Sequence, residues 1–290
     1  MVQIKHEPSS LGLFQRAMRV IREEGYSALI WLLLWKMLWK KPALRSLVLW
    51  RFAVTTRNIV VLEDALKFVS CSEPSLLSRE FGALISPWQM HSEIQALCEI
   101  IRQRRPRTVL EIGTAWGGTF FLFSRVAADD AFLVTIDLPT KDLKPWRSLC
   151  AHLGKIGQNV IVIDGDSHAT STVERVHRVL GERKVDFLFI DGDHSYEGVR
   201  QDFENYVGFL SHAGIVAFHD INPDYWTRFG KRTMYCAGGV YRFWAEVKMK
   251  YPYAEFIDNP DQDGFGIGTL FVGSDAGKTL MDSHQPEFHN

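Results

Sequence analysis

A regular alternation of short apolar runs with longer amphipathic stretches, beginning at Pro87, constrains the fold more than any other feature of this sequence. Apolar runs bounded by turn residues predict strands, and apolar residues at helical spacing predict helices. The expected strands are residues 108–112, 132–136, 160–163, 185–190 and 215–218, with two closing strands at about 253–258 and 267–273. The expected helices are residues 88–104, 117–127, near 143–154, 169–180, 196–210 and 238–250. Strands that alternate with helices form a parallel sheet covered on both faces, so we expect an α/β fold around a mostly parallel, seven-stranded sheet.

The alternation also predicts the domain organisation. Residues 1–84 are expected to form a basic, apolar, helical N-terminal segment, residues 85–275 the α/β domain, and residues 276–290 a C-terminal tail. A chain of 290 residues suits one such domain with an appended segment. The four cysteines show no C-x-x-C pair, and no signal peptide is visible. This pattern argues against a zinc site or a secreted disulfide framework and favours a cytoplasmic protein.

The charge of the chain is concentrated in its N-terminal segment. Residues 1–60 hold ten Lys or Arg against three Glu, a net of +7, which leaves −8 for the remainder of a chain whose total is −1. Within this segment, residues 28–54 are rich in leucine and tryptophan and too short in apolar length to cross a membrane. Trp31, Trp35 and Trp39 recur every four residues, as in helices that lie in a lipid headgroup layer.

Two readings of that segment remain open. It predicts either peripheral contact with the inner membrane surface, or a helix buried against the α/β domain or against a second copy in a homo-oligomer. Its positive charge is mixed with tryptophan and leucine, and no base-reading motif is present, so we expect no nucleic-acid partner.

The stretch VLEIGTAWGG, residues 109–118, joins a predicted strand to a predicted helix through a glycine-rich turn. Gly113 allows the backbone to turn and approach a ligand, and the later glycine pair opens the helix close to the sheet. The spacing departs from the G-x-G-x-x-G dinucleotide fingerprint. Glu111 would repel a pyrophosphate but would accept the ammonium of S-adenosylmethionine (SAM). The residues of this loop expected to bind SAM are Glu111, Gly113, Thr114, Ala115, Gly117 and Gly118.

Acidic residues follow the next two predicted strands. Asp137 ends the second strand roughly 20 residues beyond the glycine loop, where a carboxylate can accept both ribose hydroxyls of a nucleoside. Asp166 and Ser167 follow the third strand, where the adenine should lie. A turn-forming role is the alternative for Asp137.

These segments, with FLFIDGDHSYEGVRQDF (187–203) and GIVAFHD (214–220), resemble the class I SAM-dependent methyltransferases. The resemblance is greatest to the branch that contains cephalosporin hydroxylase-like proteins and macrocin-type sugar O-methyltransferases, and it covers about residues 85–273. It implies a Rossmann-like fold whose sheet closes with an antiparallel terminal strand. It also implies a divalent metal, Mg²⁺ foremost, held by Asp191, His219 and Asp220. His219 departs from the family pattern, which more often has an acid there.

Asp191 and His194 are the expected catalytic residues. His194 follows Asp191 by three positions, where catechol-type relatives place a lysine base, and a histidine can accept a hydroxyl proton near neutral pH. His194 could instead orient a metal-bound aspartate, and Asp191 and Asp220 could simply order loops or cap helices. Five other histidines have no comparable context and are expected at the surface or on helices: His91, His152, His168, His177 and His212.

The expected activity is SAM-dependent O-methylation of a hydroxyl on a saccharide or related small molecule. SAM already carries an activated methyl group, so the protein must chiefly align the acceptor and remove its proton. A metal would hold the acceptor oxygens and lower their pKa. The alternatives are an oxidative protein of the cephalosporin hydroxylase type that retains the SAM fold, and a non-catalytic binding module.

Overall fold

The computed structural model describes residues 42–70, 85–139, 148–233 and 236–272. The chain divides into two compact units, Met1–Arg51 and Phe52–Asn290, and the second contains the sheet. The strands are β1 (Thr108–Ile112), β2 (Phe132–Asp137), β3 (Asn159–Asp164), β4 (Val185–Ile190), β5 (Leu210–His219), β6 (Tyr253–Phe256) and β7 (Ile267–Phe271). The helices are α2 (Pro42–Asn58), α3 (Leu62–Val69), α5 (His91–Arg104), α6 (Gly118–Val126), α8 (Thr170–Leu180), α9 (Tyr196–Tyr206), α10 (Tyr225–Phe229) and α11 (Val240–Val247), with short 3₁₀ turns at Val207–Phe209 and Lys248–Lys250.

The seven strands form one sheet in the order β3-β2-β1-β4-β5-β7-β6. Strands β1 to β5 pair in parallel, whereas β7 pairs antiparallel with both β5 and β6. The prediction of a Rossmann-like, mostly parallel, seven-stranded sheet with an antiparallel terminal strand is confirmed. From β1 the chain adds β2 and β3 on one side of the sheet, and then crosses over to add β4 and β5 on the other side of β1. The direction in which strands are added therefore reverses between β1 and β4. Ligands of open α/β sheets bind at the carboxyl ends of the strands at such a point.

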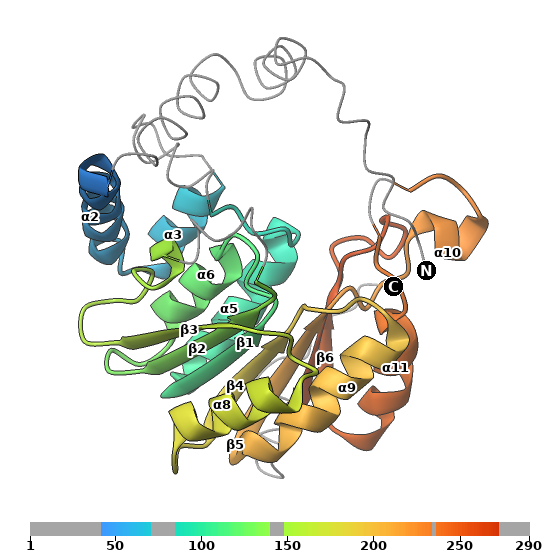
Figure 1. The fold of residues 1–290 in the computed structure, drawn as a ribbon. Helices are drawn as coiled ribbons and strands as arrows, with labels where there is room; N and C mark the ends of the chain where they lie inside the picture. Colours follow the sequence, from blue (N-terminus) through green and yellow to red (C-terminus); the bar gives the residue numbers. More distant parts are fainter. Residues whose placement is uncertain (1–41, 71–84, 140–147, 234–235, 273–290) are drawn as a thin grey trace. The chain divides into compact units, whose positions relative to one another are not determined.

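Helices cover both faces of the sheet, with α3, α5 and α6 on one face and α8, α9 and α11 on the other (Figure 1). All five residues of β1 are buried because apolar side chains on both of its faces meet a helix layer. On α8, the buried residues Thr172, Val176 and Leu180 recur every four positions, which is the spacing of one helix face. The sheet and its helix layers therefore fix the carboxyl ends of β1 to β5 in space.

The compact unit that contains the sheet begins before residue 85. Helix α3 packs against α6, where the rings of Phe68 and Phe121 lie 5.6 Å apart. The buried guanidinium of Arg125 on α6 donates from Nη1 to the carbonyl oxygens of Thr56 (3.1 Å) and Ile59 (2.5 Å), and from Nη2 to the carbonyl oxygen of Leu153. Burial lowers the pKa of Arg125 to about 9. These bonds join residues just before α3 to the helix layer of the sheet.

Most predicted elements have observed counterparts within three residues at each end. The largest difference is at the start of the strand predicted at 215–218, because β5 begins five residues earlier, at Leu210. The helix predicted at 196–210 accordingly ends earlier, at Tyr206. The polar residues at the start of β5 concealed this part of the strand, and its pairing with β4 shifts register between Val185 and Phe187. Of the predicted helix near 143–154, residues 148–150 are helical and residues 140–147 lie outside the described residues. None of the described helices is long and apolar enough to cross a membrane.

Candidate active site

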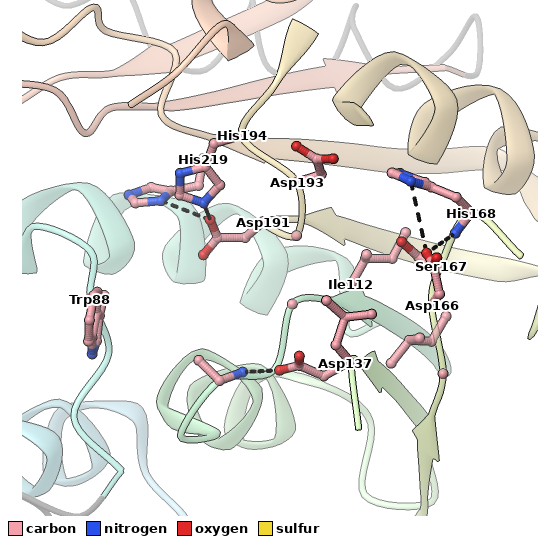
Figure 2. Close-up of a pocket in the computed structure, with 16 residues that line it drawn as sticks. Trp88, Ile112, Asp137, Asp166, Ser167, His168, Asp191, Asp193, His194 and His219 are labelled. Carbon is pink, nitrogen blue, oxygen red and sulfur yellow. Dashed lines mark hydrogen bonds and ion pairs between the residues drawn. The ribbon is translucent and has the colours of Figure 1, made fainter. Parts of the chain in front are cut away.

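A pocket of about 610 Å³ opens at the carboxyl ends of β1 to β5 (Figure 2). Its volume is in the range of cavities that bind small molecules. Predicted site residues that line it are Gly113, Ala115, Asp137, Asp166, Ser167, Asp191, His194 and His219. The other lining residues are Trp88, Ile112, Ile136, Leu138, Gly165, His168, Gly192 and Asp193. The structure thus brings together residues from the ends of five parallel strands.

The glycine loop after β1 is held against the loop after β4. Gly113 has φ +91°, and a Cβ at this position would lie 1.9 Å from the carbonyl oxygen of Asp191. A residue with a side chain would therefore be excluded both by backbone conformation and by space. The next loop residue that lines the pocket, Ala115, also has a positive φ of 42°. Thr114, Gly117 and Gly118 are placed in or beside the loop but do not line the pocket.

The end of the pocket at which we expected a nucleoside (the nucleoside end) is formed by the loops after β2 and β3. The Asp137 carboxylate accepts a hydrogen bond from the backbone N–H of Ala115 at 2.6 Å, which joins the end of β2 to the glycine loop. The Asp166 carboxylate accepts from the backbone N–H of His168 at 2.9 Å. Both carboxylates line the pocket, as the sequence predicts for residues that contact ribose and adenine.

Glu111 lies beneath the glycine loop and does not line the pocket. Its side chain is fully buried, and its two carboxylate oxygens accept hydrogen bonds from the hydroxyls of Thr119 (2.7 Å) and Thr135 (2.8 Å). Burial raises the pKa of Glu111 to about 8, although the two hydroxyls oppose this shift. The structure therefore does not bring Glu111 to the position in which we expected it to meet the SAM ammonium.

At the other end of the pocket, where we expected the reaction (the reaction end), four ionisable side chains from the ends of β4 and β5 lie close together, and three of them line the pocket. Asp191 Oδ1 lies 3.1 Å from His219 Nδ1 and 3.6 Å from His194 Nε2. Asp220 Oδ2 lies 3.0 Å from His194 Nδ1, and Asp220 Oδ1 lies 3.4 Å from His219 Nδ1. The cluster is further held by Gln89, whose Nε2 donates to Asp191 Oδ2 at 2.7 Å. The predicted meeting of these four residues at one sheet edge is observed, although Asp220 lies behind the pocket wall.

Opposite charges determine the protonation of this cluster. Burial alone would lower the pKa of His194, but Asp191 and Asp220 outweigh burial and raise it to about 12. The pKa of His219 is raised by the same two carboxylates against the effect of its burial. Burial would raise the pKa of Asp191, but the two imidazoles lower it to about 2. As the cluster stands, His194 carries a proton at neutral pH and is a proton donor.

The cluster also has the donor atoms of a metal site. One atom each from Asp191, His219 and Asp220 lie within 4.8 Å of one another. Adjacent ligands around an ion with bonds of about 2.1 Å lie about 3 Å apart in an octahedral arrangement, which the 3.1 Å separation of His219 Nδ1 from Asp191 Oδ1 approaches. The two oxygens of the fully buried Asp220 have only the imidazole nitrogens of His194 and His219 near them and make no hydrogen bond of regular geometry with the described residues. These three residues therefore fit a divalent cation.

The lining residues that were not predicted as site residues include His168, Trp88 and Leu138. His168 was assigned to the surface or a helix, but its Nε2 lies 3.3 Å from the buried Asp202 of α9. Trp88 and Leu138 lie at the pocket with 65% and 53% of their surface exposed. No sequence signal points to Trp88, which directly precedes the Gln89 whose side chain donates to Asp191 in the structure. Residues 28–41 of the basic N-terminal segment and the C-terminal tail lie outside the described residues.

Comparison with known families identifies the central part of this unit. Residues 110–221 match the family described as a methyltransferase domain, a stretch that runs from β1 through β5 and includes the pocket loops. The match covers 112 of the 290 residues and coincides with the sequence motifs that resemble the methyltransferases. The y4gI protein of Sinorhizobium fredii is 28% identical over 191 residues, which is 62% of this chain. The chain spans about a fifth, 19%, of the length of that relative.

Solved structures share the fold. An O-methyltransferase from Bacillus cereus, in complex with SAH, matches 72% of this chain and 90% of its own with a TM-score of 0.50 and 16% identity. A Staphylococcus aureus protein assigned as a caffeoyl-CoA O-methyltransferase matches 72% of this chain and 98% of its own with a TM-score of 0.51 and 20% identity. At these identities the likeness shows the Rossmann-like methyltransferase fold.

Proposed function

We propose that this methyltransferase domain binds SAM in the pocket and transfers its methyl group to a hydroxyl oxygen of a saccharide or related small molecule. The observation that carries the proposal is the layout of one cavity. Its nucleoside end presents Asp137 and Asp166, and its other end presents Asp191, His194 and His219. A nucleoside bound at the first end would direct its sulfonium toward the second. The solved O-methyltransferase with bound SAH has the same fold.

The chain's own residues have distinct parts in this proposal. The Asp137 carboxylate accepts hydrogen bonds from the ribose hydroxyls, and Gly113, which has no side chain, allows the amino-acid part of SAM to pass close to the backbone. His194 Nδ1 lies 3.0 Å from the carbonyl oxygen of Cys236 and can keep a proton there, which leaves Nε2 to receive the acceptor's proton. The transferred methyl forms a bond to the acceptor oxygen as its bond to the sulfonium breaks.

A divalent ion would be held by Asp191, His219 and Asp220. When bound, such an ion supplies positive charge that lowers the pKa of an acceptor hydroxyl and offsets the two carboxylates that keep His194 protonated. The saccharide acceptor follows from the resemblance to macrocin-type sugar O-methyltransferases. Two adjacent hydroxyls on one ring would match a chelating site of this kind.

The test measures the cofactor and the product separately. Calorimetry of the full chain with SAM and with S-adenosylhomocysteine should show binding of both. Incubation with SAM, a divalent salt and a panel of glycans should give a product heavier by one CH₂ group, together with S-adenosylhomocysteine. A chain that binds neither nucleoside contradicts the proposal, and a product that gains oxygen would support the hydroxylase-type alternative instead.

The basic N-terminal segment gives a second, separate proposal. Residues 28–54 contact an anionic membrane surface without crossing it, because lysines flank their tryptophans and leucines. The full chain should sediment with vesicles that contain phosphatidylserine, and a chain lacking residues 1–51 should not. That deletion ends at the boundary between the two compact units and keeps Thr56. Equal sedimentation of both chains would contradict the proposal.

A further inference from the structure

One donor of the reaction cluster is a nitrogen atom, and its position is fixed by the fold. His219 is the last residue of β5, pairs with Ile267 of β7, and is 2% exposed. Its ring packs edge-on against Phe265, with ring centroids 6.0 Å apart. Its Nδ1 lies 3.1 Å and 3.4 Å from oxygens of Asp191 and Asp220. Any cation that the two carboxylates share would therefore meet an imidazole nitrogen.

The surroundings of the cluster favour a cation. Asp191 and Asp220 bring two carboxylates to one place, and no lysine or arginine is among the described residues that line the pocket. The only positive charges at the cluster within the described part of the chain are those of His194 and His219. Asp220 adds a second sign, because its two buried oxygens make no hydrogen bond of regular geometry with the described residues and lie near only the imidazole nitrogens of His194 and His219.

The kind of donor atom then selects among cations. Mg²⁺ prefers oxygen ligands and gives up water reluctantly, whereas imidazole is a preferred ligand of iron, nickel and zinc. We propose that the Asp191–His219–Asp220 cluster selects a first-row transition-metal ion over Mg²⁺, because His219 supplies a nitrogen where an oxygen would favour Mg²⁺. This inference rests on the proposed role of the site as a divalent-ion site, and it revises the Mg²⁺ expected from the sequence.

The decisive variant changes one donor atom. In His219→Asn, the amide oxygen can occupy the place of Nδ1, so the site keeps three ligands and loses its nitrogen donor. Oxygen sites also bind Co²⁺ more tightly than Mg²⁺, so the ratio of the two affinities must be compared between the native chain and the variant. The native full chain, freed of metal with a chelator, is titrated with CoCl₂ and with MgCl₂ by calorimetry.

We expect His219→Asn to weaken Co²⁺ binding by about 10- to 100-fold and to change Mg²⁺ binding by no more than about threefold. The visible absorption of bound Co²⁺ gives a second readout, because replacing a nitrogen ligand with oxygen shifts its d–d bands. His168→Ala is the matched control, since it removes a histidine from the same pocket but outside the cluster. It should leave both metal affinities and the Co²⁺ spectrum unchanged.

If His219→Asn does not fold, as judged by circular dichroism, His219→Asp provides the oxygen donor and should shift the ratio toward Mg²⁺ in the same way. An unchanged Co²⁺ to Mg²⁺ ratio in a folded variant overturns the inference, as does native protein that binds neither ion. These outcomes leave the methyltransferase proposal standing if SAM still binds and methyl transfer proceeds. Failure to bind SAM contradicts that proposal and leaves the metal result intact.

Discussion

The two ends of the pocket hold their polar groups in different ways. At the nucleoside end, each carboxylate is anchored by a backbone N–H: Asp137 by that of Ala115 in the neighbouring glycine loop, and Asp166 by that of His168 in its own loop. At the reaction end, Asp191, His194 and the residues behind them are held by one another's charges. The first arrangement depends on the backbone, so it is in place before any ligand binds. The second depends on protons or cations, so changes there should affect rate and metal binding more than nucleoside affinity.

The largest loss of stability is expected where the glycine loop packs against the loop after β4, between the two ends of the pocket. Gly113→Ala would place a Cβ 1.9 Å from the carbonyl oxygen of Asp191 in a residue with φ +91°. We expect the free energy of unfolding to fall by more than about 4 kcal/mol, as measured by urea denaturation. Gly230→Ala is the control, because its φ is +61° but its Cβ would meet no described atom within 4 Å. It should cost about 1 kcal/mol. Equal losses in both variants would show that the two loops can separate at little cost.

A substitution at the reaction end should change rate without changing nucleoside affinity. His194→Ala should lower turnover by roughly 10²- to 10⁴-fold and leave the dissociation constant of SAM within about twofold, because it removes a positioned proton acceptor. The matched variant is His168→Ala at the nucleoside end, which should weaken SAM binding and retain turnover at saturating SAM. Rate assays and calorimetry on both proteins check this split. If both variants lose affinity and rate alike, the two ends are not functionally separate.

Glu111 lies buried beneath the glycine loop, and its protonation should affect the free energy of unfolding. Burial raises the pKa of this carboxyl from about 4.5 to about 8. Its contribution to stability is therefore fully present below pH 4.5 and is lost as the pH rises through 8. Glu111→Gln should remove this loss and be more stable than the native chain by at most about 3 kcal/mol at neutral pH, with a smaller difference at pH 5. Urea denaturation at both values checks the trend, and a difference that shrinks as the pH rises would contradict it.

The smallest effect is expected on SAM affinity, when Asp137, the proposed partner of the ribose hydroxyls, is replaced. Asp137→Ala removes a carboxylate that lines the nucleoside end, and it should weaken SAM binding by roughly 1–3 kcal/mol. Asp137→Asn keeps an oxygen that can accept the backbone N–H of Ala115, so it separates loop anchoring from charge. Calorimetry measures both variants. Unchanged affinity in a folded Asp137→Ala protein would place the ribose elsewhere.

The sequence predicted the strands that carry the site residues better than it predicted the side-chain contacts within the site. β1 and β4 have the predicted bounds because their apolar runs end at turn residues, and the residues after them occupy the predicted edge of the sheet. The burial of Glu111 could not be read from its motif. It depends on hydroxyls of Thr119 and Thr135, which meet the carboxylate only after α6 and β2 pack around it.

His168 shows the same limit of sequence reasoning. Its neighbour Asp202 is fully buried, and burial raises the pKa of that carboxyl to about 6. The two residues are far apart in the sequence and meet only because α9 packs beside the loop that follows β3. Spacing along a chain identifies residues that share one strand end, but it does not identify partners brought together by a helix from another part of the sheet.

The buried guanidinium of Arg125 determines where this chain can be joined to another. Its acceptors include the carbonyl oxygens of Thr56 and Ile59, which precede the sheet by about 50 residues but belong to the same compact unit. A chimaera with its junction after residue 58 would keep the charged group but replace the helical turn that positions the carbonyl oxygen of Thr56, and a misplaced acceptor is costly for a buried charge. A junction before Phe52 keeps these acceptors. Exchange of the N-terminal segment is therefore expected to succeed only if the stretch from residue 52 onward is kept with the compact unit that contains the sheet.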